Sequence, residues 1–128
     1  MNLLKIAIFG SLLLSVAACQ TTRPVPAGMY HSQQKYLTFG EKKAMVGAMD
    51  TNGAYTFGWA WNQSSVESAI ESATTGCVEG RYSSEIIGEC KVHFIGNTNV
   101  RNFSEEDLKL AIAAYEKGEP IVKVENVE

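Results

Sequence analysis

The side chains best suited to acid–base chemistry are Glu67, Glu71 and His93. Two carboxylates four positions apart share one face of a helix, and histidine changes its charge near neutral pH, so general acid and base catalysis is one use for them. The sequence places no partner acid, base or metal ligand beside the glutamates, so a solvated helix face explains them better. The chain also contains neither Gly-x-Ser-x-Gly nor His-Glu-x-x-His. We therefore expect no catalytic residue, no metal and no cofactor.

The thiols are the other reactive groups, and Cys19 stands apart from Cys77 and Cys90. It follows a lysine at position 5, an apolar run from 6 to 16 and two alanines. A charged start, a short apolar core and a small-residue cleavage site are typical of a secretory signal peptide. About a dozen apolar residues are short for a membrane span, which needs about 20. The sequence therefore predicts a signal peptide over residues 1–18, and an uncleaved N-terminal anchor is the less favoured alternative.

The residues that lead to this cysteine, Leu-Ser-Val-Ala-Ala-Cys at 14–19, resemble the lipobox of bacterial lipoproteins. The resemblance implies cleavage before Cys19, a diacylglycerol on its sulfur and a fatty acid such as palmitate on the new amine. Two or three acyl chains, at about 0.8 kcal/mol per buried methylene, hold a protein stably on a membrane. Gln20, rather than Asp, after the cysteine implies the periplasmic face of the outer membrane. We therefore expect the bilayer to be the first partner, reached through the lipid.

Cys77 and Cys90 remain once Cys19 carries the lipid. In an oxidising compartment such a pair usually forms a disulfide, and a bridge across this short loop stabilises the fold by about 3 kcal/mol. A metal site would need more ligands than His93 supplies, and a redox pair usually has the spacing Cys-x-x-Cys. The structural bridge is favoured, with the metal site and the redox pair as alternatives.

Length and charge limit the class of protein. The 128 residues allow one domain, and the net charge of −3 leaves no basic patch, so we expect no nucleic-acid partner. Pro24, Pro26 and Gly28 stand among polar residues. They predict that residues 19–35 form a lipidated tether and that residues 36–128 form a single small domain.

A β-hairpin is predicted over residues 44–61. Asn52-Gly53 favours a two-residue type I′ turn, because both central residues of that turn need positive φ. This turn would place small residues opposite aromatic ones, in the pairs Ala44–Trp61, Val46–Trp59 and Ala48–Phe57. The aromatic side chains alternate along the return strand, so we expect them to form the buried face, with a stacking platform for sugars or peptides as the alternative.

The opposite face of this hairpin is flat, small and uncharged. It would carry Met45, Gly47, Met49, Thr56, Gly58 and Ala60. Uncovered apolar patches are uncommon on monomers, so we expect the second helix or the segment before the hairpin to cover this face. The alternative is a contact surface for a partner or a second copy, with the candidate residues Met45, Met49, Thr56, Gly58, Trp61 and His93.

The first helix is predicted from Ser64, which fits a capping box with Glu67, to Gly76. Its apolar stripe ends in Cys77 and comprises Val66, Ala69, Ile70, Ala73 and Cys77. A loop over 78–89 then leads to a strand over 90–95. In that strand we expect Val92 and Phe94 to face the helix with Cys90, and His93 to be exposed on the other side.

A second helix is predicted after Ser104, with acidic residues in its first turn and an apolar stripe of Leu108, Ala111, Ile112 and Tyr115. Gly118 and Pro120 would end it. The segment from 121 to 124 is then either an edge strand or a frayed tail.

A second resemblance covers the middle of the chain. Its residues are Lys43-Ala44, Asp50-x-x-Gly53, Gly58-Trp59-Ala60, Ser64-x-x-x-Ser68-Ala69, Ala73-x-x-x-Cys77 and Cys90-Lys91-Val92-x-Phe94-Ile95-Gly96. They are similar to a small module of secreted bacterial proteins, in which a Gly/Trp hairpin precedes an alanine-rich helix. The resemblance implies that fold and a Cys77–Cys90 bridge, but no reaction.

Together these patterns predict an α+β fold, in which an antiparallel hairpin and further strands pack on one or two helices in the order β-β-α-β-α, with a last strand optional and one disulfide. The function that we expect is that of a non-enzymatic envelope lipoprotein that binds or assembles with an envelope protein. One alternative is an inhibitor that inserts the loop over 78–89 into a periplasmic enzyme. The other is a hydrolase acting on the cell wall.

Overall fold

The fold is α+β with one disulfide, as the sequence predicts. The structure, a computed structural model, describes residues 24–123, so the predicted signal peptide, Cys19 and residues 124–128 lie outside the described residues. A four-stranded antiparallel sheet has the order β2-β1-β3-β4. Its strands are β1 (Ala44–Met49), β2 (Tyr55–Ala60), β3 (Lys91–Ile95) and β4 (Thr98–Asn99).

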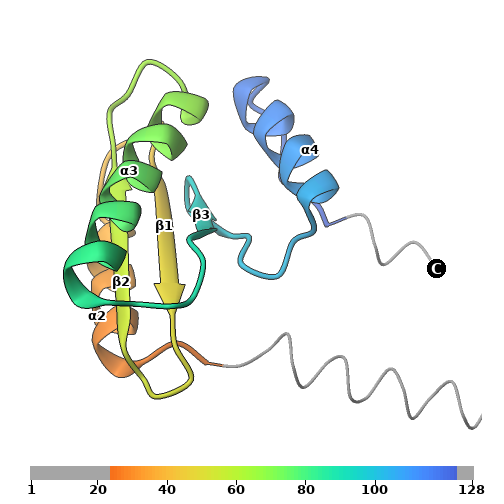
Figure 1. Cartoon of the computed structure of the whole chain (residues 1–128). Helices are drawn as coiled ribbons and strands as arrows, with labels where there is room; N and C mark the ends of the chain where they lie inside the picture. The colour runs from red at the N-terminus through yellow and green to blue at the C-terminus, as the bar shows by residue number, and fades with distance from the viewer. Residues whose placement is uncertain (1–23, 124–128) are drawn as a thin grey trace, which may run out of the picture.

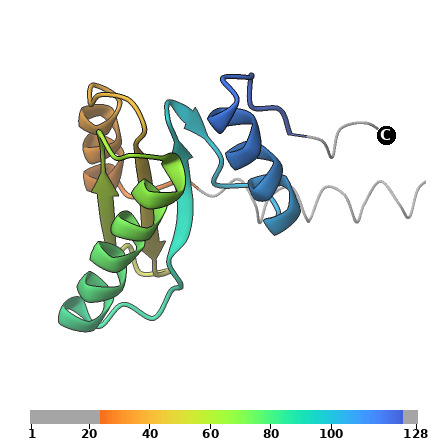
Figure 2. The same ribbon diagram turned by 90° about the horizontal axis from the view of Figure 1, so that it is seen from above.

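Three helices surround this sheet. α2 (Ala27–Tyr36) and α3 (Val66–Ser84) cover opposite faces, and α4 (Glu105–Glu116) lies beyond β3 (Figure 1). Figure 2 shows the three layers from above, with β1 and β2 between the two covering helices. Both faces of the sheet are therefore used for packing.

α2 occupies residues that the sequence analysis assigned to the tether. Met29 and Tyr36 are fully buried in one cluster with Met45 and Phe94. The Tyr36 hydroxyl donates a hydrogen bond to the Gly96 carbonyl oxygen at 2.8 Å. The expectation of a tether is wrong for residues 27–35, because this short polar segment takes its helical stability from the sheet beneath it rather than from its own apolar periodicity.

Lys43 closes the C-terminal end of α2. Its ammonium Nζ donates to the carbonyl oxygens of Tyr36, Leu37 and Phe39 at 3.0, 3.1 and 3.1 Å. A positive charge at this end also suits the helix dipole. The side chain is buried, and desolvation lowers the pKa of Lys43 below its usual value. One side chain at the start of β1 therefore ties α2 to the sheet.

The hairpin strands are confirmed, but their register is shifted by one residue. Val46 lies opposite Gly58 and Met45 opposite Trp59. The loop is closed by Asp50, whose N–H donates to the Ala54 carbonyl oxygen at 2.9 Å. Gly53 has a φ of +95°, whereas Asn52 is outside the left-handed region, so the turn is not type I′. A three-residue loop forms instead. The extra loop residue shifts the register by one, and a one-residue shift exchanges which side chains of the two strands share a face.

α3 packs its small residues directly onto β2. Ser65, rather than Ser64, caps the helix by accepting the Ser68 N–H at 3.1 Å, and the predicted stripe is buried except for half-buried Ile70. A Cβ atom at Gly58 would collide with the Ala73 carbonyl oxygen and lie 2.7 Å from the Cys77 nitrogen. The flat face predicted for the hairpin is therefore not one surface: α3 covers Gly58, whereas Met45 and Gly47 lie on the other side of the sheet, under α2.

The helix also continues past Gly76, so the expected loop over 78–89 is wrong. It ends at Ser84, where Glu85 adopts a left-handed conformation with φ of 56°. Gly76 does not end the helix. A Cβ at this position would lie 3.3 Å from the Gly58 Cα, so the absence of a side chain lets α3 pack close to β2. Only the segment from Glu85 to Cys90 links α3 to β3.

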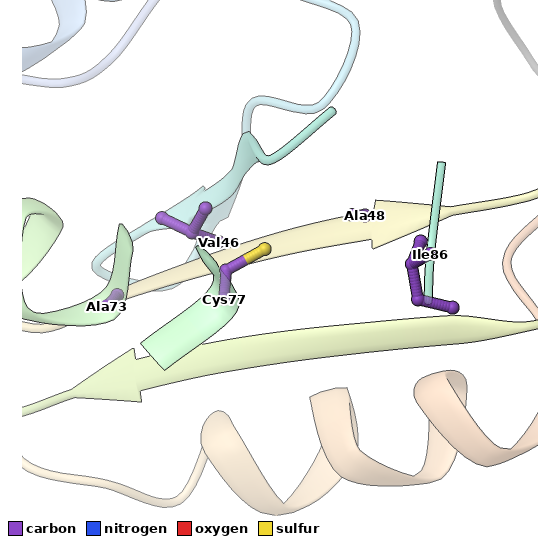
Figure 3. Close-up of a cluster of buried hydrophobic side chains, with 5 residues drawn as sticks. All are labelled: Val46, Ala48, Ala73, Cys77 and Ile86. Carbon is purple, nitrogen blue, oxygen red and sulfur yellow. The ribbon is translucent and has the colours of Figure 1, made fainter. Parts of the chain in front are cut away.

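The disulfide joins α3 to the start of β3. Cys77 and Cys90 are bonded, with their Cα atoms 6.2 Å apart. Figure 3 shows the Cys77 sulfur directed toward β1, in a buried cluster with Val46, Ala48, Ala73 and Ile86. The predicted bridge is confirmed, and it anchors the middle of a helix rather than its last turn.

A β-bulge in β3 reverses two sequence predictions. Met45 pairs with Phe94 and the next residue, Val46, pairs with Val92, so His93 is the extra residue. Phe94 consequently joins the cluster under α2, and Val92 packs with the cluster under α3. The expectation that these two residues face the same side is therefore wrong.

α4 begins as predicted, at Ser104, whose Oγ accepts the Asp107 N–H at 3.1 Å. Ala111 packs with Val66, Ile95 and Val100. Glu116 Oε2 accepts the Val66 N–H at 2.8 Å, so α4 supplies an acidic partner to the first turn of α3. Residues 121–123 form no strand.

Candidate functional site

The three acid–base candidates do not meet. Glu67 and Glu71 are exposed on α3. His93 contacts Gly47 on the other face of the sheet, where Met29 of α2 also lies. The sheet thus separates the histidine from both carboxylates, and the three cannot form one acid–base site.

His93 is buried, not exposed as the sequence analysis expected. The side chain is 2% exposed, and its Nδ1 has no hydrogen-bond partner among the described residues. Burial lowers the pKa of His93 from 6.5 to about 4, with smaller contributions from the positive charges of Arg101 and Lys91. A neutral imidazole enclosed by apolar side chains packs as part of the core.

The candidate contact surface is also not a surface. Met45 is fully buried, and Gly58 and His93 are buried as well. The six residues are divided between the two faces of the sheet, with Thr56 and Gly58 toward α3 and the others away from it. Only Trp61, at the end of β2, is exposed, to 41%. The one-residue error in register produced this false grouping.

The outer edge of β2 offers a different candidate. In an antiparallel pair, residues alternate between those that bond to the partner strand and those that point away from it. The Asp50–Ala54 bond sets this alternation, so Tyr55, Phe57 and Trp59 direct their N–H and C=O groups away from β1. None of these groups has a hydrogen-bond partner within residues 24–123. We call these groups the β2 edge.

The composition of this strand leaves the edge unprotected. Native edge strands are usually blocked by charge, proline or a bulge. β2 contains no charged residue and no proline, and its pairing with β1 is regular. The alternation of aromatic side chains does not reveal this edge, whereas the absence of charge and proline from residues 55–60 is a sequence signal that does.

Aromatic rings lie beside the β2 edge. Phe57 and Trp59 have ring centroids 4.9 Å apart, and Phe39 lies 5.0 Å from Trp59 and 4.3 Å from Trp61. Tyr55, Phe57 and Trp59 are half-buried rather than enclosed as expected. The edge therefore combines backbone groups that are unpaired within residues 24–123 with accessible apolar surface.

One cavity, of about 480 Å³, opens between the start of α2 and the strand β4. Its lining includes Val25, Tyr30, Gln33, Asn99 and Arg101. Gln33 is 6% exposed. The cavity is open to solvent beside the first described residues.

Two further observations concern the described part of the chain. Between residues 24 and 123, no cluster of His, Cys, Asp and Glu side chains is suited to holding a metal ion. Over the same residues, no helix combines the length and apolar character that crossing a membrane requires.

Comparison of the sequence with protein-family models and with curated proteins, and of the structure with solved structures, found no match.

Proposed function

We propose that this chain is a non-enzymatic lipoprotein of the bacterial envelope, held at the periplasmic face of the outer membrane by Cys19, and that it binds an envelope protein through the β2 edge. The signal-peptide pattern and the lipobox resemblance support the anchor. The disulfide supports an oxidising compartment.

The observation that carries the binding function is the β2 edge. Tyr55, Phe57 and Trp59 present backbone donors and acceptors that lie next to exposed aromatic surface. An extended segment of a partner can add to such an edge as a further strand, with main-chain hydrogen bonds giving affinity and side-chain contacts giving specificity. The partner is then a protein with an extended, apolar-aromatic segment.

The anchor is tested by mass spectrometry of the protein purified from envelopes. We expect a chain that starts at Cys19 and carries fatty acid, and we expect Cys19→Ser to abolish both processing and acylation. A processed chain without fatty acid at Cys19 would contradict the proposal.

The binding site is tested with a photo-crosslinking amino acid in place of Trp61, in living cells. We expect one discrete protein adduct, absent when the same amino acid replaces Leu110 on α4, which is 50% exposed. In the same background Tyr55→Pro should abolish the adduct, because proline removes an outward N–H.

The matched control is Tyr55→Val, which also removes the ring but keeps the N–H and should retain the adduct. An adduct that proline does not affect, or that forms equally from Leu110, would count against binding by strand addition.

The structure offers less support to the two alternative functions than to strand addition at the β2 edge. The inhibitor needs a loop over 78–89, and these residues are helical up to Ser84. The hydrolase would need a nucleophile with a base, or paired carboxylates, in one cleft, and His93 lies across the sheet from Glu67 and Glu71.

A further inference from the structure

The domain begins much closer to the lipidation site than a tether over 19–35 would allow. α2 is part of the domain, and Pro24 is its first described residue. Five residue steps separate Pro24 from Cys19, and a fully extended chain advances at most about 3.6 Å per residue. The domain therefore cannot rise more than about 18 Å above the point where the lipid enters the bilayer.

The end of the domain that meets this tether is built from three segments, which we call the tether end. Residues 24–26 line one small cavity together with Asp50, Thr51 and Gly53 of the hairpin loop. The Asp50 carboxylate in turn accepts the N–H groups of Ile87 at 3.1 Å and Gly88 at 2.7 Å. The start of α2, the hairpin loop and the segment after α3 thus lie together at the lower end of Figure 1.

Exposed apolar side chains lie in the last turn of α3 and in the segment of the tether end that follows it. Ile87 and Tyr82 are each 83% exposed, the highest values among the large apolar side chains of the described residues. They belong to one local structure, because Arg81 donates to the Ile87 carbonyl oxygen at 3.1 Å and lines a pocket with Tyr82 and Ile86. An exposed isoleucine and an exposed tyrosine suit the boundary between headgroups and acyl chains.

We propose that the tether end rests on the bilayer, with Ile87 and Tyr82 inserted among the lipid headgroups. The proposal builds on the lipid anchor of the proposed function. The tether is short, so it holds this end of the domain close to the bilayer. The exposed apolar side chains lie at the same end, where they can contact the lipids. The domain is then oriented, with the tether end on the membrane and α4 away from the hairpin loop (Figure 1).

Charge predicts which lipids this end prefers. Glu85 and Glu89 are exposed on either side of Ile87. Carboxylates are repelled by an anionic surface, so contact should be closer on a zwitterionic bilayer of phosphatidylethanolamine and phosphatidylcholine than on one rich in phosphatidylglycerol.

The experiment places a nitroxide label on the acylated full-length protein in such zwitterionic vesicles. Ile87→Cys gives the test site, and Leu110→Cys, an exposed aliphatic position on α4, gives the matched control. The native bridge keeps Cys77 and Cys90 oxidised, so the added thiol alone takes the label. Tyr82→Cys provides a second test site.

We expect collisions with oxygen to exceed those with a water-soluble nickel chelate at positions 87 and 82, and the reverse at position 110. The difference should shrink in phosphatidylglycerol vesicles. Equal accessibility at all three positions, in protein that mass spectrometry shows to be acylated, would overturn the membrane contact and leave the anchor standing. Protein that carries no fatty acid and stays in the aqueous phase would overturn the anchor and the contact together.

Discussion

The stability of this fold should be sensitive to acid because His93 is buried and its Nδ1 has no hydrogen-bond partner among residues 24–123. His93 has a pKa of about 4 in the folded state and 6.5 as its ordinary value. Between these values the unfolded chain binds a proton that the folded chain does not, so protonation favours unfolding. The contribution of neutral His93 to the free energy of unfolding is fully present above about pH 6.5. The free energy of unfolding should fall by roughly 3 kcal/mol as the pH drops to about 4.

The test is urea unfolding at about pH 7.5 and about pH 4.5. The variant His93→Leu has an apolar side chain of similar size that cannot titrate. Its free energy of unfolding should therefore fall less on acidification than that of the native chain, by about this amount. Equal losses in both proteins would show that His93 is not the group that responds.

Lys43 is the second residue whose role depends on burial. We expect Lys43→Met to destabilise the domain by about 2–4 kcal/mol, because three carbonyl oxygens at the end of α2 lose their donor. Lys42→Met is the matched control, since the Lys42 side chain is exposed, and it should leave the free energy of unfolding nearly unchanged. Equal effects of the two substitutions would contradict the capping role.

The role of a single residue could be predicted where its chemistry alone determines that role. Cys77 and Cys90 could be paired from the predicted oxidising compartment and the cysteine count, and the bridge is present. His93 could not be placed, because the bulge that turns it inward arises from pairing with β1, a contact distant in sequence.

At the scale of elements, the packing of α3 on β2 depends on positions without a Cβ atom. A side chain at Gly58 would meet the backbone of α3 at Ala73 and Cys77, which cannot rotate away. We expect Gly58→Ala to cost about 3 kcal/mol, measured by thermal and urea unfolding.

Gly28→Ala is the comparison for this prediction. Its Cβ would meet the ring end of Tyr55, a side chain that can move, so it should be tolerated far better than Gly58→Ala. If Gly58→Ala is equally well tolerated, then the contact between α3 and β2 is looser than the structure describes.

Elements with strong periodicity were predicted, and those stabilised by tertiary contacts were not. The stripe that ends in Cys77, the two hairpin strands and the helix after Ser104 follow from local pattern. α2 was missed because its buried residues, Met29, Gln33 and Tyr36, are few and include an amide. The hairpin register was missed because Asn-Gly also fits a three-residue loop with glycine in its last position.

At the scale of the molecule, the two covering helices should differ in how firmly they are held. α3 packs backbone against backbone on β2 and is bonded to β3 by the disulfide. α2 rests on the other face through a few side chains and Lys43. We expect the amides of α2 to exchange with deuterium through a local opening of lower free energy than global unfolding.

Native-state hydrogen exchange at increasing urea concentration measures this difference. The α2 amides should show a smaller opening energy and a weaker urea dependence than the α3 amides between Ala69 and Cys77. Coincident opening of both helices in a single step would mean that α2 and the core form one cooperative unit.

The position of α2 along the chain has a mechanical consequence. If the bilayer holds Cys19 while a partner pulls on β2, tension passes first through α2 and then through the Lys43 contacts into the central strand β1. α2 should detach first, leaving the covalently bridged sheet and α3 loaded but intact. The rise per residue over its ten residues would increase from about 1.5 to about 3.4 Å. Unfolding of α2 would therefore lengthen the connection between the membrane and the bound partner without breaking the rest of the domain.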